Sequence, residues 1–187
     1  MRSSKRDHLV ETALTLFKRH GFHATGIDRV IAEAGVARMT LYNHFKSKDE
    51  LILAVLRRRD EMFRNWFMRR VEKAAPDGRG RLLFMFDVLG EWFAGDDFTG
   101  CMFINASAEF ADGDDPIHRA AAEHKALVLG FIEGLAADAG AARPKALAAG
   151  VFLLVEGAIV TAHVMGRKDA AQAAKRSAEA LMRDAGI

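Results

Sequence analysis

Side chains that can contact an anionic polymer are concentrated between residues 38 and 48. The candidates among them are, in order, Arg38, Thr40, Tyr42, Asn43, His44 and Lys48. Hydroxyl and cationic groups are common ligands of DNA phosphates, and Arg and Asn can each make paired hydrogen bonds to a purine base. The chemistry that these residues offer together is recognition of double-stranded DNA.

Apolar residues that alternate with these polar ones predict the helix that carries them. Val36, Leu41 and Phe45 predict a short helix over about residues 38–45, buried on one side and polar on the other. Ala37 precedes this helix and cannot cap it, a loss of about 1 kcal/mol relative to a capping side chain. Tyr42 and Phe45 also fit the plain core of a three-helix bundle, and that alternative stays open.

Two further helices are predicted before it. The first ends at Gly21, since glycine is the common residue just beyond a helix. The second begins at Thr25, with Asp28 three residues on in a capping-box-like position, and it ends at Gly35. Two short helices joined by a tight turn at Gly35 have the layout of a helix-turn-helix, whose second helix enters the major groove of DNA.

A long helix is predicted after the polar stretch. Ser47 and Glu50 have the spacing of a capping box, and the helix runs from there to about residue 73. Its expected inner positions are Leu51, Val55, Met62, Trp66 and Val71. This helix would join the small N-terminal head to the rest of the chain.

Gly- and Pro-containing breaks divide the rest of the chain into five more helices. Their expected ranges are 80–94, 101–111, 116–139, 144–166 and 169–185. We therefore predict an all-α fold of about nine helices, in which a three-helix head is joined by the long helix to a larger body. The predicted domains are residues 1–48, with the helix-turn-helix at about 27–46, and residues 49–187.

The head resembles the DNA-binding domain of the TetR/AcrR transcriptional regulators over about residues 5–55. The resemblance rests on Thr25, Val30 and Ala34-Gly35-Val36, followed by Thr40-Leu41-Tyr42-x-His44-Phe45-x-x-Lys48-x-x-Leu51. It implies phosphate contacts from Thr25, Thr40, Tyr42, His44 and Lys48, and places Arg38, Met39 and Asn43 nearest the base edges. Ala37 and Met39 depart from the family's usual Ser and Gly, so we expect the DNA preference to differ there.

The same resemblance implies a body that binds a small apolar or amphipathic effector. The candidate lining residues are Phe86, Trp92, Cys101, Met102, Asn105, Glu109 and His124. Aromatic and Met side chains suit varied apolar ligands, although most of them would serve equally as ordinary core. Cys101 is the single cysteine of the chain, and no His or Asp is obviously paired with it in the sequence, which favours a small buried residue over a reactive thiol. Helices 144–166 and 169–185 would pair with those of a second subunit.

The charge distribution agrees with an anionic partner for the head. Residues 1–59 hold 12 Lys and Arg against 6 Asp and Glu, or +6, whereas the whole chain carries only +2. One cysteine and an N-terminus without a long apolar segment predict a cytoplasmic protein with no membrane contact. We expect a ligand-responsive repressor that binds a palindromic operator as a homodimer, with no metal, cofactor or enzymatic activity. The alternatives are a helical enzyme or thiol-based sensor that uses Cys101, and an architectural DNA-binding protein that takes no ligand.

Overall fold

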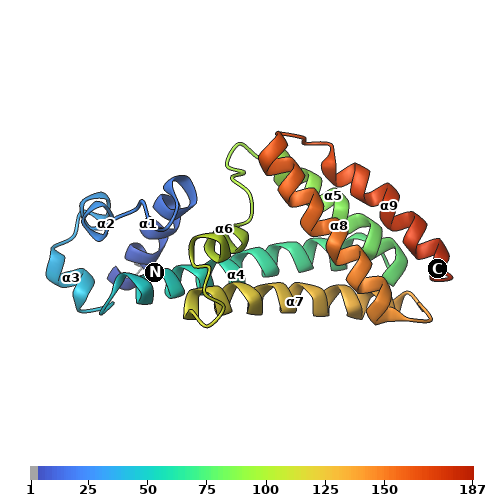
Figure 1. Ribbon diagram of the computed structural model, residues 1–187, viewed down its shortest axis with the longest axis horizontal. Coiled ribbons are helices and arrows are strands. Elements are labelled where there is room, and N and C mark those ends of the chain that lie inside the picture. Colours follow the sequence, from blue (N-terminus) through green and yellow to red (C-terminus); the bar gives the residue numbers. More distant parts are fainter. Residues whose placement is uncertain (1–3) are drawn as a thin grey trace. The chain divides into compact units, whose positions relative to one another are not determined.

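The computed structural model describes residues 4–187, and in that range the chain forms nine helices and no strands (Figure 1). Their bounds are α1 Lys5–His20, α2 Ile27–Ala34, α3 Arg38–Tyr42, α4 Lys48–Ala74, α5 Gly78–Ala94, α6 Met102–Glu109, α7 Pro116–Asp138, α8 Pro144–Met165 and α9 Ala170–Asp184. The all-α fold is therefore confirmed, and the five helices of the predicted body lie within three residues of their expected bounds.

The helices form two compact units. One unit combines the chain up to Met62 with Met102–His124, and the other combines Phe63–Cys101 with Lys125–Ile187. The long helices α4 and α7 each run through both units. These compact units differ from the predicted division at residues 48 and 49, which follows expected roles and remains a prediction.

The head is held together by apolar side chains from α1, α2 and α3. Leu9, Val30 and Leu41, one from each helix, are fully buried. The Ser4 side chain caps α1 by accepting a hydrogen bond from the Asp7 backbone N–H at 3.1 Å. This small core fixes the three helices against one another.

The predicted start of α2 at Thr25 is wrong. The helix begins at Ile27, and Gly26 occupies the cap position. Thr25 is buried, and its hydroxyl donates to the Gly21 carbonyl at 2.7 Å, four residues back. A local side-chain bond of this kind competes with capping, which explains why the Thr25–Asp28 spacing does not form a capping box.

The capping box at the start of α4 is confirmed, with one difference of geometry. The Glu50 backbone N–H donates to Ser47 Oγ at 3.2 Å, while the Glu50 carboxylate accepts from the Lys46 N–H at 2.8 Å. Farther along α4, the predicted inner positions Met62 and Trp66 are wrong because both side chains are exposed. The next residues, Phe63 and Phe67, are buried instead.

The second unit is organised around α8, which packs against α9, while α5 packs against both (Figure 1). The buried positions of α9 are mostly alanines, which let the helices approach closely. Among the helices of residues 4–187, only α8 is long and apolar enough by length and composition to cross a membrane, and soluble core helices pass the same test. Its packing against α5 and α9 accounts for its inner face, while several apolar side chains on its outer face are exposed.

Candidate nucleic-acid interface

The turn between α2 and α3 places the predicted reading helix. Gly35 has φ 62°, in the left-handed region that side-chain-bearing residues rarely adopt, and its N–H bonds back to the end of α2. The helix α3 ends at Tyr42 and not at residue 45 as predicted, since the His44 N–H bonds to the Leu41 carbonyl only three residues back and tightens the turn. Leu41 within α3 and Phe45 just beyond it are both buried and anchor this segment from its inner side. The opposite side of α3 is therefore free to face a partner.

The predicted base-reading and phosphate-binding residues lie mainly on that outer side. Met39 is 67% exposed, which is unusual for so large an apolar side chain. Tyr42 is exposed as well, so its ring does not belong to the core of the three-helix bundle. Asn43 and His44 are also exposed, and Thr40 is half-buried. This arrangement suits insertion of α3 into a groove.

Arg38, the first residue of α3, is not free in the structure. Its terminal guanidinium nitrogen donates to the carboxylate of Asp28 on α2, and the two side chains form an ion pair. Asp28 was predicted from the sequence to cap a helix, and its contact with Arg38 was therefore not predicted. The only available signal was the pair of opposite charges placed ten residues apart across a helix-turn-helix.

Lys48 begins α4 beside the loop that joins α1 and α2. Its ammonium donates to the His23 carbonyl at 3.3 Å. An ammonium group has three N–H donors, so two remain for a phosphate. The N-terminus of α4 adds its helix dipole at the same place.

Thr25 is the exception among the predicted phosphate ligands. It is fully buried, and its hydroxyl is committed to the Gly21 carbonyl. The side chain therefore stabilises the α1–α2 loop in this structure and does not face solvent with the others.

Glu109, expected to line an effector cavity, instead contacts the head. Its carboxylate accepts hydrogen bonds from the backbone N–H groups of Phe22 and His23, and Phe110 stacks on the His23 ring with centroids 4.7 Å apart. Burial by itself raises the pKa of Glu109, but these hydrogen bonds and the His23 ring together bring it below its ordinary value. The sequence held no local signal for a contact between residues 86 positions apart.

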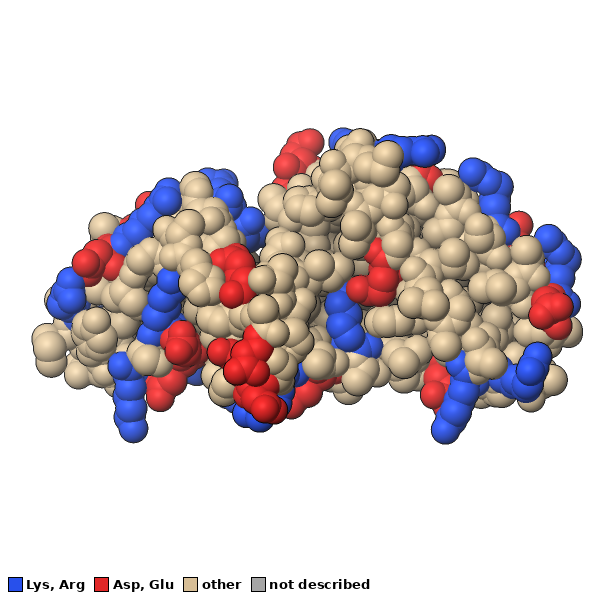
Figure 2. Space-filling view, viewed as in Figure 1, with Lys and Arg blue, Asp and Glu red and all other residues tan. Residues whose placement is uncertain are grey.

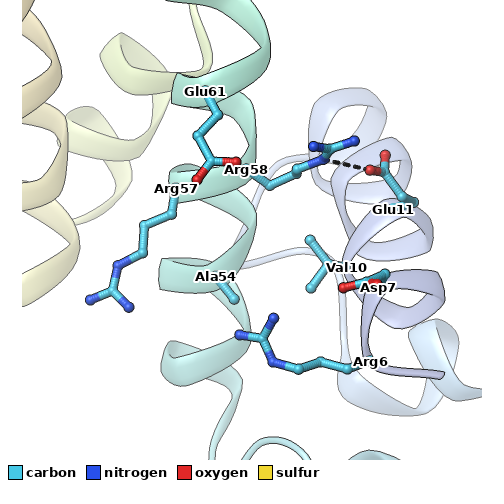
Figure 3. A pocket seen from close by; sticks show the side chains of 8 residues that line it. All are labelled: Arg6, Asp7, Val10, Glu11, Ala54, Arg57, Arg58 and Glu61. Atoms are coloured by element: carbon cyan, nitrogen blue, oxygen red, sulfur yellow. Dashed lines mark hydrogen bonds and ion pairs between the residues drawn. The ribbon is translucent and has the colours of Figure 1, made fainter. Parts of the chain in front are cut away.

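A polar groove of about 550 Å³ lies between α1 and α4 in the same unit (Figure 3). Arg58 crosses it and donates from Nε to Glu11 at 2.8 Å, and Arg6 extends toward α4. Three arginines and three acidic residues line the groove, so it favours neither sign of charge; they are Arg6, Arg57 and Arg58 with Asp7, Glu11 and Glu61. We assign it no ligand.

The other predicted effector-lining residues are divided between the two units. Met102, Asn105 and His124 share the unit of the head, where His124 is buried, stacked on Phe103 and 2.7 Å from an Asp60 carboxylate oxygen. Phe86, Trp92 and Cys101 lie in the second unit, where Trp92 belongs to a cluster of aromatic rings. His124 therefore has a packing and hydrogen-bonding role that needs no ligand.

Cys101 is buried and unpaired with any other cysteine. The Lys125 ammonium lies 3.5 Å from its sulfur and 2.7 Å from the carboxylate of Glu156. In residues 4–187, no group of three or more His, Cys, Asp and Glu side chains is arranged to hold a metal ion. The burial of Cys101 agrees with its expected role as a small core residue.

Two family models together match most of the chain. The model described as "Bacterial regulatory proteins, tetR family" matches residues 9–55, which contain the whole helix-turn-helix. The model described as "Tetracyclin repressor-like, C-terminal domain" matches residues 78–178. The first match falls on the head and the second begins at the first helix after α4.

Individual relatives agree with these models. The crystal structure of SCO4454, a TetR-family transcriptional regulator from Streptomyces coelicolor, is 31% identical with a TM-score of 0.91, over 98% of this chain and 96% of that one. The transcriptional activator FasR of Mycolicibacterium smegmatis is 38% identical over 43% of this chain and 36% of its own length. The repressor KstR2 of the same organism is 40% identical over 29% of this chain and 27% of its own length. The chain thus matches about a third or less of these two curated relatives.

Proposed function

Since this chain belongs to the TetR family of bacterial regulatory proteins and is a DNA-binding transcriptional regulator, we propose that it is a homodimeric repressor with a palindromic operator. A small apolar or amphipathic effector would release it from the DNA. The similar proteins FasR and KstR2 are named an activator and a repressor, so a promoter assay decides the direction of control. We place its action in the cytoplasm, where bacterial DNA lies.

The observation that carries this proposal is the two-sided character of α3. Leu41 is completely buried, whereas Met39 two positions earlier is 67% exposed and Asn43 is exposed as well. We assign Arg38, Met39 and Asn43 to base edges, with Arg38 on a guanine and Asn43 on an adenine. Thr40, Tyr42, His44 and Lys48 would bind phosphates on either side.

We assign the dimer interface to α8 and α9. Large apolar side chains are exposed there at Leu153, Val160, Val164, Met165 and Leu181. Figure 2 shows that the surface over α8 is mostly uncharged. The sequence of this helix, PKALAAGVFLLVEGAIVTAHVM, agrees with this because most of its residues are apolar. A self-complementary apolar patch of this kind suits a two-fold interface between identical subunits.

We place the effector site in the second compact unit. We keep Phe86, Trp92 and Cys101, which lie in one compact unit, as the proposed lining residues. Binding can release DNA only if the effector prefers the conformation whose heads do not match the operator. Effector screening should therefore measure loss of DNA binding alongside any rise in melting temperature.

Selection of bound sequences from random DNA by the purified protein tests the proposal directly. We expect a two-fold symmetric site with half-sites roughly one helical turn, about 34–36 Å, apart. An Arg38→Ala change should relax the preference at one position of each half-site. A Lys48→Ala change should weaken binding to all sequences and reduce the salt slope by about one. Recovery of no enriched site at moderate salt would refute sequence-specific recognition.

A further inference from the structure

We propose that Asp28 is a specificity-determining residue that holds the Arg38 guanidinium in position to read a base. The proposal rests on the proposed function, in which Arg38 contacts a guanine. Asp28 would not touch the DNA bases itself, and it would act by orienting the side chain that does.

The ion pair with Asp28 leaves enough N–H donors on Arg38 for a contact with a base. Asp28 lies in the first turn of α2, and Arg38 is the first residue of α3. One terminal nitrogen of the guanidinium contacts one carboxylate oxygen. A guanidinium has five N–H donors, so enough remain for a paired contact with a guanine while Asp28 stays bound.

The exposure of the pair argues against a role in holding the head together. The side chains of Arg38 and Asp28 are 60% and 77% exposed, and ion pairs this exposed contribute little to folding stability. A free arginine, in contrast, loses much rotamer freedom when it binds. A partner that fixes Arg38 before binding reduces that loss, so the gain appears in recognition and not in stability.

The negative charge of Asp28 should also weaken binding to DNA regardless of the base sequence. The Asp28 side chain is 77% exposed beside Arg38. If Arg38 reads a base as proposed, this negative charge lies close to the DNA and weakens binding to every sequence. Removing the charge should therefore raise affinity for random DNA while lowering the discrimination between bases. This combination separates an orienting role from a structural one, since a damaged fold would weaken binding to every sequence.

The test compares Asp28→Asn, Arg38→Ala and the double variant on the selected operator and on its single-base replacements. We expect Arg38→Ala to reduce discrimination about tenfold or more at one base pair of the half-site. Asp28→Asn should reduce discrimination at that same base pair by about three- to tenfold, and should add nothing in the Arg38→Ala background. Asp28→Glu should retain part of the discrimination because it keeps a carboxylate.

Glu33→Gln is the matched control, because Glu33 is exposed on the same helix and the change alters the net charge equally. It should raise general affinity as Asp28→Asn does and leave the base preferences unchanged. Unchanged preferences in Asp28→Asn, with a loss in Arg38→Ala, would overturn the role of Asp28 alone. Unchanged preferences in Arg38→Ala would overturn the assignment of Arg38 as a reading residue, and with it the basis of this proposal. Thermal melting of each variant confirms that the head is folded.

Discussion

The Glu109 carboxylate at the end of α6 accepts a hydrogen bond from the His23 backbone N–H at 2.6 Å, and the same oxygen lies 3.0 Å from Nδ1 of the His23 ring. Its other oxygen accepts the Phe22 N–H at 2.9 Å. The two N–H groups belong to the loop between α1 and α2. In the same loop, the His23 carbonyl accepts a hydrogen bond from the Lys48 ammonium. One carboxylate therefore links α6 to the loop that adjoins a proposed phosphate ligand.

Replacing Glu109 by Ala should destabilise the protein by about 1–3 kcal/mol, because two backbone N–H groups would lose a charged acceptor. Denaturant unfolding monitored by circular dichroism measures the change. Glu123→Ala is the control, since Glu123 is exposed on α7, and it should shift the unfolding free energy by less than about 0.5 kcal/mol. Equal effects of the two changes would mean that the Glu109 contacts do not stabilise the folded state.

The same carboxylate should contribute to stability in a pH-dependent way. Although burial opposes it, the hydrogen bonds of the backbone and the His23 ring lower the pKa of Glu109 from its ordinary value of 4.5. A carboxylate with a lowered pKa stabilises the folded state above its unfolded pKa, and this contribution is lost as pH falls through the folded value. The stability difference between the natural protein and Glu109→Gln should therefore be constant near pH 7 and shrink below about pH 4.5. A difference that stayed constant down to pH 3 would contradict this assignment.

The capping box of α4 predicts a second stability effect. Ser47→Ala removes the acceptor of the Glu50 N–H and should cost about 1 kcal/mol of unfolding free energy. Ser177→Ala, inside α9, is the comparison, because its hydroxyl donates to the Ala173 carbonyl four residues back within the same helix. Alanine favours helix interiors, so this second change should be neutral or slightly stabilising. A similar loss in both variants would show that the cap itself contributes nothing.

Local sequence patterns predicted the buried anchors Leu41 and Phe45 and most helix bounds, although not the start of α2 or the end of α3. Leu41 and Phe45 recur at helical spacing with polar residues between them, and both are buried as the pattern indicates. Ser47 and Glu50 formed the expected capping interaction because its partners lie within one helical turn. Where only neighbouring residues decide the outcome, the sequence carries the information.

Contacts between distant segments were not predictable in this way. Met62 and Trp66 fit an apolar stripe on α4, but tertiary packing buried Phe63 and Phe67 instead. The partners of Glu109 and Asp28 are set by how α6 meets the head and how α2 meets α3. Charged residues are frequent along the chain, so periodicity gave no reason to pair these particular ones.

Gly78 at the start of α5 should not tolerate a side chain. A Cβ atom there would lie 2.6 Å from the Leu135 carbonyl oxygen and would also clash with the backbone of Ala139. Both are backbone groups that cannot rotate away, so Gly78→Ala should cost about 1–3 kcal/mol or more of unfolding free energy. Gly134→Ala should stabilise α7 by about 0.5–1 kcal/mol, because a Cβ atom there meets nothing within 4 Å. If the melting temperature shifted in the same direction in both variants, the close approach of Gly78 to the backbone of Leu135 and Ala139 would be contradicted.

The proposed dimer interface predicts that charge on α8 separates the subunits. Leu153 is 71% exposed in the single chain, so Leu153→Glu should leave each subunit folded. In the dimer the carboxylate would be buried without a partner, which should weaken association by at least about a hundredfold. Analytical ultracentrifugation should then find monomers at concentrations where the natural protein is dimeric, and binding to the two-fold operator should fall with it. Leu127→Glu is the matched control, since Leu127 is an exposed leucine on α7, outside the proposed interface. A Leu153→Glu protein that remained dimeric would exclude the centre of α8 from the interface.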